Sequence, residues 1–270
     1  MVNERTGWLQ RLLGAPAAPP ALPEGRRIYA VGDVHGCRDL LEQLVKRIRA
    51  HAGSAPSSAT NVLLMLGDYV DRGPDSKGVI DTLLGFDAPG WEKTFLRGNH
   101  DQALLDFLGD PNFYRAWRSY GAPETLLSYG VRPPLFDDEA EFVKARDALA
   151  ANLPQTHLAF LRSLANFHEE GDYFFAHAGV RPGIPLDRQM PEDLLWIRDD
   201  FLNSNRSFGK FVVHGHTPTE RPVRRSNRLG LDTGAHATGC LTAAVLEGDT
   251  CTLLSTSAAP MPSGAVAVMP

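Results

Sequence analysis

The sequence predicts an α/β fold, and three observations support the prediction. Short apolar runs rich in β-branched residues alternate with stretches whose apolar residues recur at helical spacing. Such alternation is typical of strands joined by helices in a largely parallel sheet. Several of the apolar runs end in glycine next to Asp, Asn or His. The chain of 270 residues is 43% hydrophobic and 22% charged, which is the composition of a globular protein with a large core.

The catalytic or binding domain is expected at residues 26–257, between two segments of different composition. Residues 1–25 contain a short amphipathic stretch at 8–13 and a proline-rich run at 15–23. They are predicted to form an N-terminal arm and a stiff linker. Residues 258–270 are rich in Ala, Pro and Ser, and are predicted to form a flexible tail.

The elements expected inside this domain follow from the apolar patterns. Strands are expected at Arg27–Val31, Asn61–Leu66, Lys93–Leu96, Tyr173–Ala176 and Lys210–Val213, with helices at Arg38–Ala50 and Ser76–Leu84. A mostly helical insertion is expected at about 102–164. Shorter strands are expected near the end, at Pro222–Arg225, Arg228–Leu231, Cys240–Glu247 and Thr250–Ser255. A turn at 247–250 joins the last two as a hairpin, so the sheets are expected to be mixed.

Charge and cysteine content exclude several kinds of function. The chain has 27 Lys and Arg against 32 Asp and Glu, for a net charge of −5. Because such a balance gives no general attraction to nucleic acid or to an anionic membrane, neither partner is expected. No apolar run approaches the ~20 residues that a membrane helix needs. Three cysteines without CxxC spacing argue against a disulfide framework and favour a cytoplasmic location. No feature predicts an oligomeric state.

The residues that follow five of the expected strands are the candidates for ligand and metal binding. The five runs are Gly32-Asp33-Val34-His35-Gly36, Gly67-Asp68-Tyr69-Val70-Asp71-Arg72-Gly73, Arg97-Gly98-Asn99-His100-Asp101, His177-Ala178-Gly179 and His214-Gly215-His216-Thr217. Ligands of open α/β sheets bind beyond the carboxyl ends of the strands. Five of the nine histidines lie in these runs. Asp, Asn and His without thiolates suit Mn²⁺, Fe or Zn²⁺, so the pattern predicts a metal site.

These motifs, in this order, resemble the phosphoprotein phosphatase family of calcineurin-like metallophosphoesterases. The likeness extends to Trp196-Ile197-Arg198 and Leu231-Asp232-Thr233-Gly234-Ala235, which are similar to the bacterial and bacteriophage-type serine/threonine protein phosphatase branch. The resemblance implies a four-layer α/β sandwich of two mixed β-sheets flanked by helices. It also implies two divalent metal ions at one end, of which Mn²⁺ is expected and Fe or Zn²⁺ are alternatives.

The resemblance also implies the metal ligands. Asp33 and His35 bind the first ion, and Asp68 bridges both ions. Asn99, His177 and His216 bind the second. The residue types alone leave the choice between His214 and His216 open, and the family pattern favours His216.

For the reaction, the resemblance implies direct attack of a metal-activated water on phosphorus. His100 is the expected general acid, and Asp71 orients it. Arg72, Arg198 and Asn99 are expected to bind the phosphate, since a guanidinium fork fits phosphoryl oxygens well.

Three functions are compatible with these residues. The first is a phosphomonoesterase that hydrolyses phosphoserine, phosphothreonine or phosphotyrosine in proteins, or small phosphoesters, and the Asp71-Arg72 pair favours it. The second is a symmetrical dinucleoside tetraphosphate hydrolase, a sister group that usually departs from Asp-Arg-Gly in the second motif. The third is a non-catalytic metal-binding scaffold that recognises phosphorylated partners. The complete set of expected ligands argues against the third.

Overall fold

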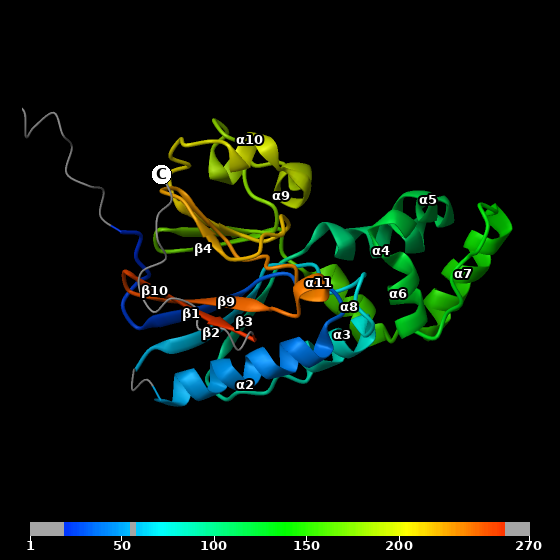
Figure 1. The fold of residues 1–270 in the computed structure, drawn as a ribbon, viewed down its shortest axis with the longest axis horizontal. Coiled ribbons are helices and arrows are strands. Elements are labelled where there is room, and N and C mark those ends of the chain that lie inside the picture. Colours follow the sequence, from blue (N-terminus) through cyan, green and yellow to red (C-terminus); the bar gives the residue numbers. More distant parts are fainter. Residues whose placement is uncertain (1–18, 55–57, 257–270) are drawn as a thin grey trace, which may run out of the picture.

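Two five-stranded β-sheets lie face to face at the centre of the structure, and helices cover their outer faces (Figure 1). The structure is a computed structural model that describes residues 19–54 and 58–256. The amphipathic stretch at 8–13 and the tail at 258–270 lie outside the described residues. The four layers are those that the sequence analysis expected.

The first sheet has the strand order β10-β9-β1-β2-β3. Its strands are β1 (Arg26–Val31), β2 (Thr60–Met65), β3 (Glu92–Phe95), β9 (Thr242–Glu247) and β10 (Thr250–Ser255). β1, β2 and β3 run parallel, whereas β9 is antiparallel to both β1 and β10. Thr250 pairs with Glu247, so the predicted hairpin is confirmed.

The second sheet has the order β4-β5-β6-β8-β7. Its strands are β4 (Phe167–Glu170), β5 (Tyr173–Ala176), β6 (Phe211–His214), β7 (Val223–Arg224) and β8 (Arg228–Gly230). The three inner strands are parallel, and both edge strands are antiparallel to their neighbours. β4 is not among the strands predicted from the sequence. This edge strand is only partly buried, and its sequence Phe-His-Glu-Glu has no apolar run.

Alternation along β1 explains why its sequence is apolar throughout. Tyr29 and Val31 face the helices that cover the first sheet, whereas Ile28 and Ala30 face the second sheet. Successive side chains of a strand point to opposite faces, so a strand between two layers must be apolar on both. The core between the sheets includes Val62 and Leu64 from β2.

All but one of the described α-helices fall into three groups. α2 (Arg38–Ser54) and α3 (Ser76–Leu84) pack on the first sheet. The helical block consists of α4 (Asn99–Gly109), α5 (Tyr114–Trp117), α6 (Ala122–Ser128), α7 (Glu139–Asn152) and α8 (Gln155–Ser163), and it projects as a lobe on the right of Figure 1. α9 (Pro191–Trp196) and α10 (Asp199–Leu202) cover the second sheet, and α11 (Ala235–Thr238) precedes β9. The block begins three residues earlier than predicted, inside the third motif. None of the described helices is long and apolar enough to cross a membrane.

The residues just before β1 contact both sheets. The Ala21 amide donates to Asp172 over 3.0 Å in the turn between β4 and β5. The Leu22 amide donates to the Gly248 carbonyl over 2.8 Å in the β9–β10 turn. The Leu22 side chain is buried in the core between the sheets. This end of the expected linker therefore packs against the domain.

Candidate active site

The predicted site residues lie together at the carboxyl ends of strands from both sheets. Asp33 and His35 follow β1, Asp68 follows β2, and Asn99 and His100 begin α4 just after β3. His177 follows β5, and His216 follows β6. Every one of these seven side chains is buried, with at most 5% of its surface exposed.

The backbone is strained where it presents these side chains. Among the described residues, five that are not glycine have a positive φ, between 46° and 72°: His35, Asp68, Asp71, Arg72 and His216. A left-handed conformation of this kind costs roughly 1–3 kcal/mol for each such residue. All five belong to the motif loops, so strain is concentrated at the site.

Asp101 holds the strained loop that carries Asp68. Its carboxylate accepts from the amides of Asp68 (2.9 Å), Tyr69 (2.9 Å) and Gly98 (2.8 Å). Burial, together with the neighbouring Asp68 charge, raises the pKa of Asp101 to about 8. No role for Asp101 is predicted from the sequence. The signal was present, because an acidic residue in the first turn of a helix often accepts from free backbone amides.

Four polar atoms converge on one point beside Asp68. His177 Nε2 lies 2.9 Å from Asn99 Oδ1, 3.2 Å from His216 Nδ1 and 3.4 Å from Asp68 Oδ2. Asn99 Oδ1 also lies 2.9 Å from His216 Nδ1. The residues come from loops after β2, β3, β5 and β6, and they are the ones that the resemblance assigned to one metal.

The chemistry of these atoms fits a cation. His177 Nδ1 donates to the Leu66 carbonyl over 2.9 Å, which leaves a lone pair on Nε2 of the neutral ring. Burial lowers the pKa of His177, and lowers that of His216 to about 2, so both rings are neutral. The Nε2 lone pair therefore faces two oxygens that are themselves acceptors. A divalent cation with nitrogen and oxygen ligands would satisfy all of them.

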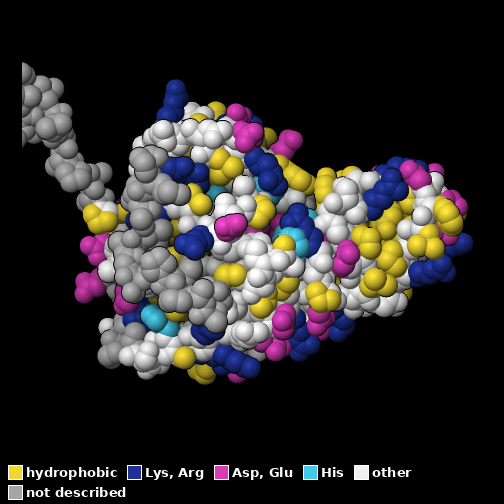
Figure 2. All heavy atoms as spheres, in the orientation of Figure 1, with side chains coloured by type: hydrophobic (Ala, Val, Ile, Leu, Met, Phe, Trp, Pro, Cys, Tyr) yellow, Lys and Arg dark blue, Asp and Glu magenta, His cyan; other side chains and the backbone are white. Residues whose placement is uncertain are grey.

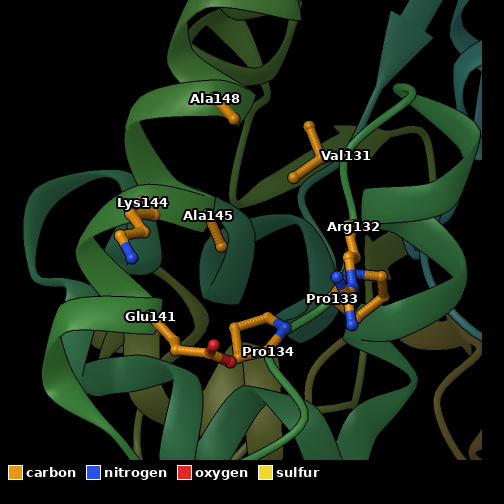
Figure 3. A pocket seen from close by; sticks show the side chains of 8 residues that line it. All are labelled: Val131, Arg132, Pro133, Pro134, Glu141, Lys144, Ala145 and Ala148. Carbon is orange, nitrogen blue, oxygen red and sulfur yellow. The ribbon is translucent and has the colours of Figure 1, made fainter.

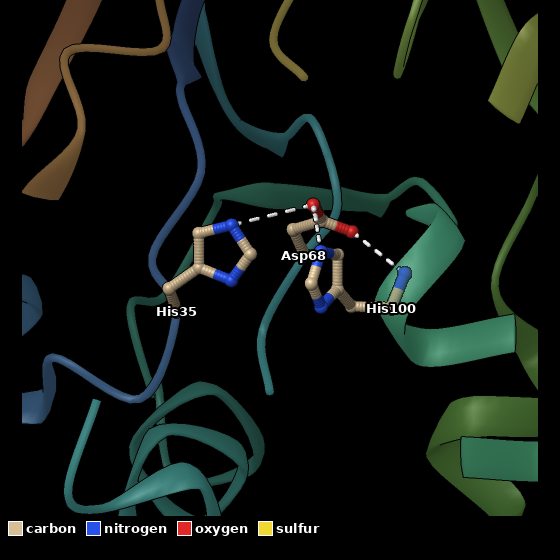
Figure 4. A group of neighbouring side chains, drawn as sticks. All are labelled: His35, Asp68 and His100. Atoms are coloured by element: carbon tan, nitrogen blue, oxygen red, sulfur yellow. Dashed lines mark hydrogen bonds and ion pairs between the residues drawn. The ribbon is translucent and has the colours of Figure 1, made fainter. Parts of the chain in front are cut away.

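A second group shares Asp68 with the first. His35 Nε2 lies 3.5 Å from Asp68 Oδ2, and His100 Nε2 lies 3.9 Å from the same oxygen (Figure 4). The Nδ1 atom of His35 donates to the Val70 carbonyl over 3.0 Å, which again turns the Nε2 lone pair toward the site. Burial lowers the pKa of His35 to about 3. Asp68 thus stands between two groups of potential ligands, each of which is buried.

Asp33 lies beside this group with an unsatisfied oxygen. Its Oδ2 accepts from the His216 amide over 2.9 Å, whereas its Oδ1 is buried without a hydrogen-bond partner among the described residues. Burial, and then the Asp232 and Asp68 charges, raise the pKa of Asp33 well above its usual range. A buried carboxylate in this state is costly unless a cation compensates it.

His100 is held by a buried carboxylate. Its Nδ1 donates to Asp71 Oδ2 over 2.7 Å, and Asp71 is completely buried. Burial acts to lower the pKa of His100, but the Asp68 and Asp71 charges outweigh it, and the pKa is raised. The expected pairing of these two residues is thus present in the structure. The structure also shows Nε2 of His100 within reach of the Asp68 group, where it could serve as a ligand or as an acid.

Arg72 and Arg198 differ in their placement. Arg72 is half-buried, and its Nη2 lies 3.2 Å from His100 Nε2. Arg198 is exposed at the start of α10. Burial is the main cause that lowers the pKa of His216, and the Arg198 charge acts in the same direction. A guanidinium only donates, so His100 Nε2 accepts from Arg72 here; a phosphoryl oxygen that replaced this contact could accept hydrogen bonds from both side chains.

His214, the other histidine of the last motif, faces away from the proposed ligand atoms. His214 is buried, and its ring contacts the Gly215 carbonyl (3.0 Å) and Arg228 Nη1 (3.3 Å). His236 is exposed on α11, with its ring 5.4 Å from that of His35. Histidine and Lys or Arg side chains reach the surface where the helical lobe meets the two sheets (Figure 2).

A cavity of about 340 Å³ lies elsewhere, on the helical block (Figure 3). Val131, Pro133, Pro134 and Ala145 form apolar parts of its lining. It contains none of the predicted site residues.

Fold and site together define a metal-dependent phosphoesterase with a dinuclear centre. The chain belongs to the calcineurin-like phosphoesterase family, whose profile matches residues 26–238. It is 28% identical over 227 residues to serine/threonine-protein phosphatase 1 of Salmonella typhimurium, covering 82% of this chain and 93% of that one. It is 25% identical over 238 residues to the asymmetrical bis(5'-nucleosyl)-tetraphosphatase PrpE of Geobacillus thermodenitrificans, covering 80% and 89%.

A solved structure of a cold-active protein tyrosine phosphatase shares the fold, with a TM-score of 0.58 at 18% identity, covering 87% of this chain and 81% of that one. The predicted family, fold and enzyme class are therefore confirmed. The relatives include both a protein phosphatase and a dinucleotide hydrolase, so similarity alone does not decide between these substrates.

Proposed function

We propose that the chain is a two-metal-dependent phosphomonoesterase that hydrolyses phosphoserine and phosphothreonine, and also phosphotyrosine, in protein substrates. The observation that carries the proposal is the buried Asp71–His100 pair beside Arg72, because it supplies an acid for a poor leaving group. The proposed ligands are Asp33 and His35 for one ion, Asn99, His177 and His216 for the other, and Asp68 for both. Mn²⁺ is the proposed metal, since it accepts this donor set and exchanges readily.

When bound, the two cations supply activation of a water and neutralisation of charge on the phosphoryl group. Arg72 and Arg198 bind the non-bridging phosphoryl oxygens and orient the phosphorus. As the bond from the water oxygen to phosphorus forms and the bond to the leaving oxygen breaks, His100 Nε2 gives its proton to the leaving oxygen. Asp71 holds the Nδ1 proton throughout, and solvent restores the proton on Nε2. The products are inorganic phosphate and a free hydroxyl side chain.

Leaving-group chemistry favours an alcohol ester over a dinucleotide. The alkoxide of serine or threonine is a strong base and must be protonated as it departs, and a positioned acid contributes about 10²–10⁴-fold in rate. A nucleotide leaves from a tetraphosphate as a stable phosphate anion that needs little protonation. The enzyme would then have little use for a raised pKa at His100.

Hydrolysis of dinucleoside tetraphosphates is the second candidate. It is favoured by the similarity to a bis(5'-nucleosyl)-tetraphosphatase over 80% of the chain. This function ranks second because dinucleoside tetraphosphate hydrolases usually depart from Asp-Arg-Gly in the second motif, whereas this chain has Asp71-Arg72-Gly73.

The test offers the Mn²⁺-loaded protein serine-, threonine- and tyrosine-phosphorylated peptides and diadenosine tetraphosphate in parallel. We expect phosphate release from the peptides at a higher kcat/KM than cleavage of the dinucleotide. Preferred cleavage of the dinucleotide would transfer the function to nucleotide hydrolysis and leave the metal site in place.

The His100→Asn variant tests the proposed acid. We expect it to retain two metal ions and to lose about 10²-fold or more in kcat on a phosphoserine peptide, but far less on an aryl phosphate with a good leaving group. Metal analysis and kinetics on both substrates measure this. Loss of a metal ion from the variant would instead make His100 a ligand, as its distance to Asp68 allows.

A further inference from the structure

We propose that the helical block positions the acid of this reaction, through Trp117 of α5 and Thr125 of α6. Both side chains hydrogen-bond to Asp71, and neither residue has a role predicted from the sequence. This inference rests on the proposed function of His100 as the acid. Trp117 and Thr125 touch neither substrate nor metal, so they are positioning residues.

Trp117 and His100 share one oxygen of Asp71. Asp71 Oδ2 accepts from His100 Nδ1 over 2.7 Å and from Trp117 Nε1 over 2.8 Å. The Trp117 and Asp71 side chains are completely buried, and His100 is 2% exposed. Because the indole nitrogen can only donate, it fixes the carboxylate without competing for the proton of His100.

Thr125 holds Asp71 from the other side. Its hydroxyl donates to Asp71 Oδ1 over 2.6 Å and accepts from the Asp71 amide over 2.8 Å. The Ser76 hydroxyl, 3.1 Å from that of Thr125, accepts from the same amide over 3.1 Å. Asp71 has a φ of 72°, so these hydrogen bonds stabilise both its side chain and its strained backbone.

The segment between Trp117 and Thr125 contacts the neighbours of Asp71. The Gly121 carbonyl accepts from the Arg72 amide over 3.3 Å, and a Cβ at Gly121 would lie 2.5 Å from that amide. The Tyr120 ring lies 5.7 Å from the His100 ring. One stretch of the helical block, residues 117–125, therefore contacts Asp71, Arg72 and His100.

These contacts fix the orientation of the Asp71 carboxylate and of the His100 ring that it holds. With both oxygens of Asp71 held, the carboxylate has one orientation, and His100 Nε2 keeps one direction toward the site. Without the Trp117 or Thr125 contact, the carboxylate can rotate and the imidazole follows it. Reactions that need the acid then slow, whereas reactions with a good leaving group continue.

The test compares Trp117→Phe and Thr125→Val, which each remove one hydrogen-bond donor to Asp71, with Thr125→Ser, which keeps the hydroxyl. Tyr114→Phe is the matched control, since Tyr114 is a buried aromatic residue of α5 that does not contact Asp71 in the structure. Each protein is loaded with diamagnetic Zn²⁺ for proton NMR of the His100 Nδ1–H resonance, and with Mn²⁺ for kinetics. We expect the resonance at low field in the wild type, because the bond to a buried carboxylate is short.

In Trp117→Phe and Thr125→Val we expect this resonance to shift upfield or broaden, and Thr125→Ser and Tyr114→Phe to leave it in place. Kinetically, both variants should lose about 10-fold or more on a phosphoserine peptide and under about 3-fold on p-nitrophenyl phosphate. An unchanged resonance in both variants, or an equal loss on both substrates, would overturn the proposal. If the wild type hydrolyses neither substrate, the proposed function fails, and the NMR result still decides whether the block positions His100.

Discussion

At the scale of single residues, Asp68 is the point on which the whole site depends. Its Oδ2 is within 3.5 Å of both His35 and His177, and its Oδ1 accepts from the His100 amide over 3.0 Å. Burial acts to raise the pKa of Asp68, the neighbouring histidines, of which His100 has a raised pKa, act to lower it, and the pKa lies below its usual range. The proposed role of this carboxylate is to bridge both cations.

Asp68→Asn should reduce the content of both metal ions together. An amide has the shape of the carboxylate but lacks the charge that two cations would share. Metal analysis of the dialysed variant, with Asp39→Asn on the surface of α2 as the control, measures this. If one ion remained at full occupancy, Asp68 would not be a bridging ligand.

At the scale of elements, the loops after the strands work because glycine lets other groups approach them closely. A Cβ at Gly215 would lie 1.9 Å from Asp33 Oδ1, and a Cβ at Gly98 would lie 2.0 Å from Asp68 Oδ1. Real Cβ contacts are not this short, so a larger residue would displace a proposed ligand. These glycines are thus part of the site although they carry no chemistry.

Gly215→Ala should lower metal affinity while the protein stays folded. The added methyl group would push Asp33 out of place, and we expect the metal content after dialysis to fall by at least half in at least one site. Gly53→Ala in α2 is the control, because a Cβ there has open space. Full metal content in Gly215→Ala would mean that Asp33 is not a ligand.

The role of the helical block is the feature of the fold that the sequence predicts least well. Helical periodicity predicts the block, but it does not show that Asn99 and His100 form the first turn of α4. The block's contacts with Asp71 could not be read at all. Trp117 and Thr125 are separated from Asp71 by 46 and 54 residues, and no local pattern marks a buried tryptophan as a hydrogen-bond donor to a distant carboxylate.

At the scale of the whole molecule, one arginine ties the two sheets together. Arg26 of β1 pairs with Glu92 of β3 over 2.7 Å and with Glu170 of β4 in the other sheet. Burial acts to raise the pKa of Glu170, but Arg26 and His168 outweigh it, and the pKa is lowered below the usual 4.5. A carboxylate with a lowered pKa stabilises the fold above pH 4.5, and that stabilisation is lost as the pH falls through the folded pKa.

Arg26→Ala should therefore cost about 1–3 kcal/mol of unfolding free energy at pH 7, and less below pH 4.5. Urea unfolding of the variant and the wild type across this range measures the difference. Arg38→Ala, which removes an exposed pair with Glu42 on α2, is the control and should change stability little at any pH in this range. A deficit that stays constant with pH would contradict the assigned partnership with Glu170.

The sequence by itself determined the α/β class, most of the strands and the kinds of ligand at their ends. Strand, turn and metal-ligand chemistry are local properties, so a run such as Gly32-Asp33-Val34-His35-Gly36 discloses them within five residues. The edge strand β4 escaped because its sequence is polar. The tertiary structure alone decided the contacts that hold these residues in place: the hydrogen bonds from the Asp68 loop to Asp101, and those of Trp117 and Thr125 with Asp71. These contacts join residues far apart in the chain, and only the packing of the sheets and the helical block brings them within hydrogen-bonding distance.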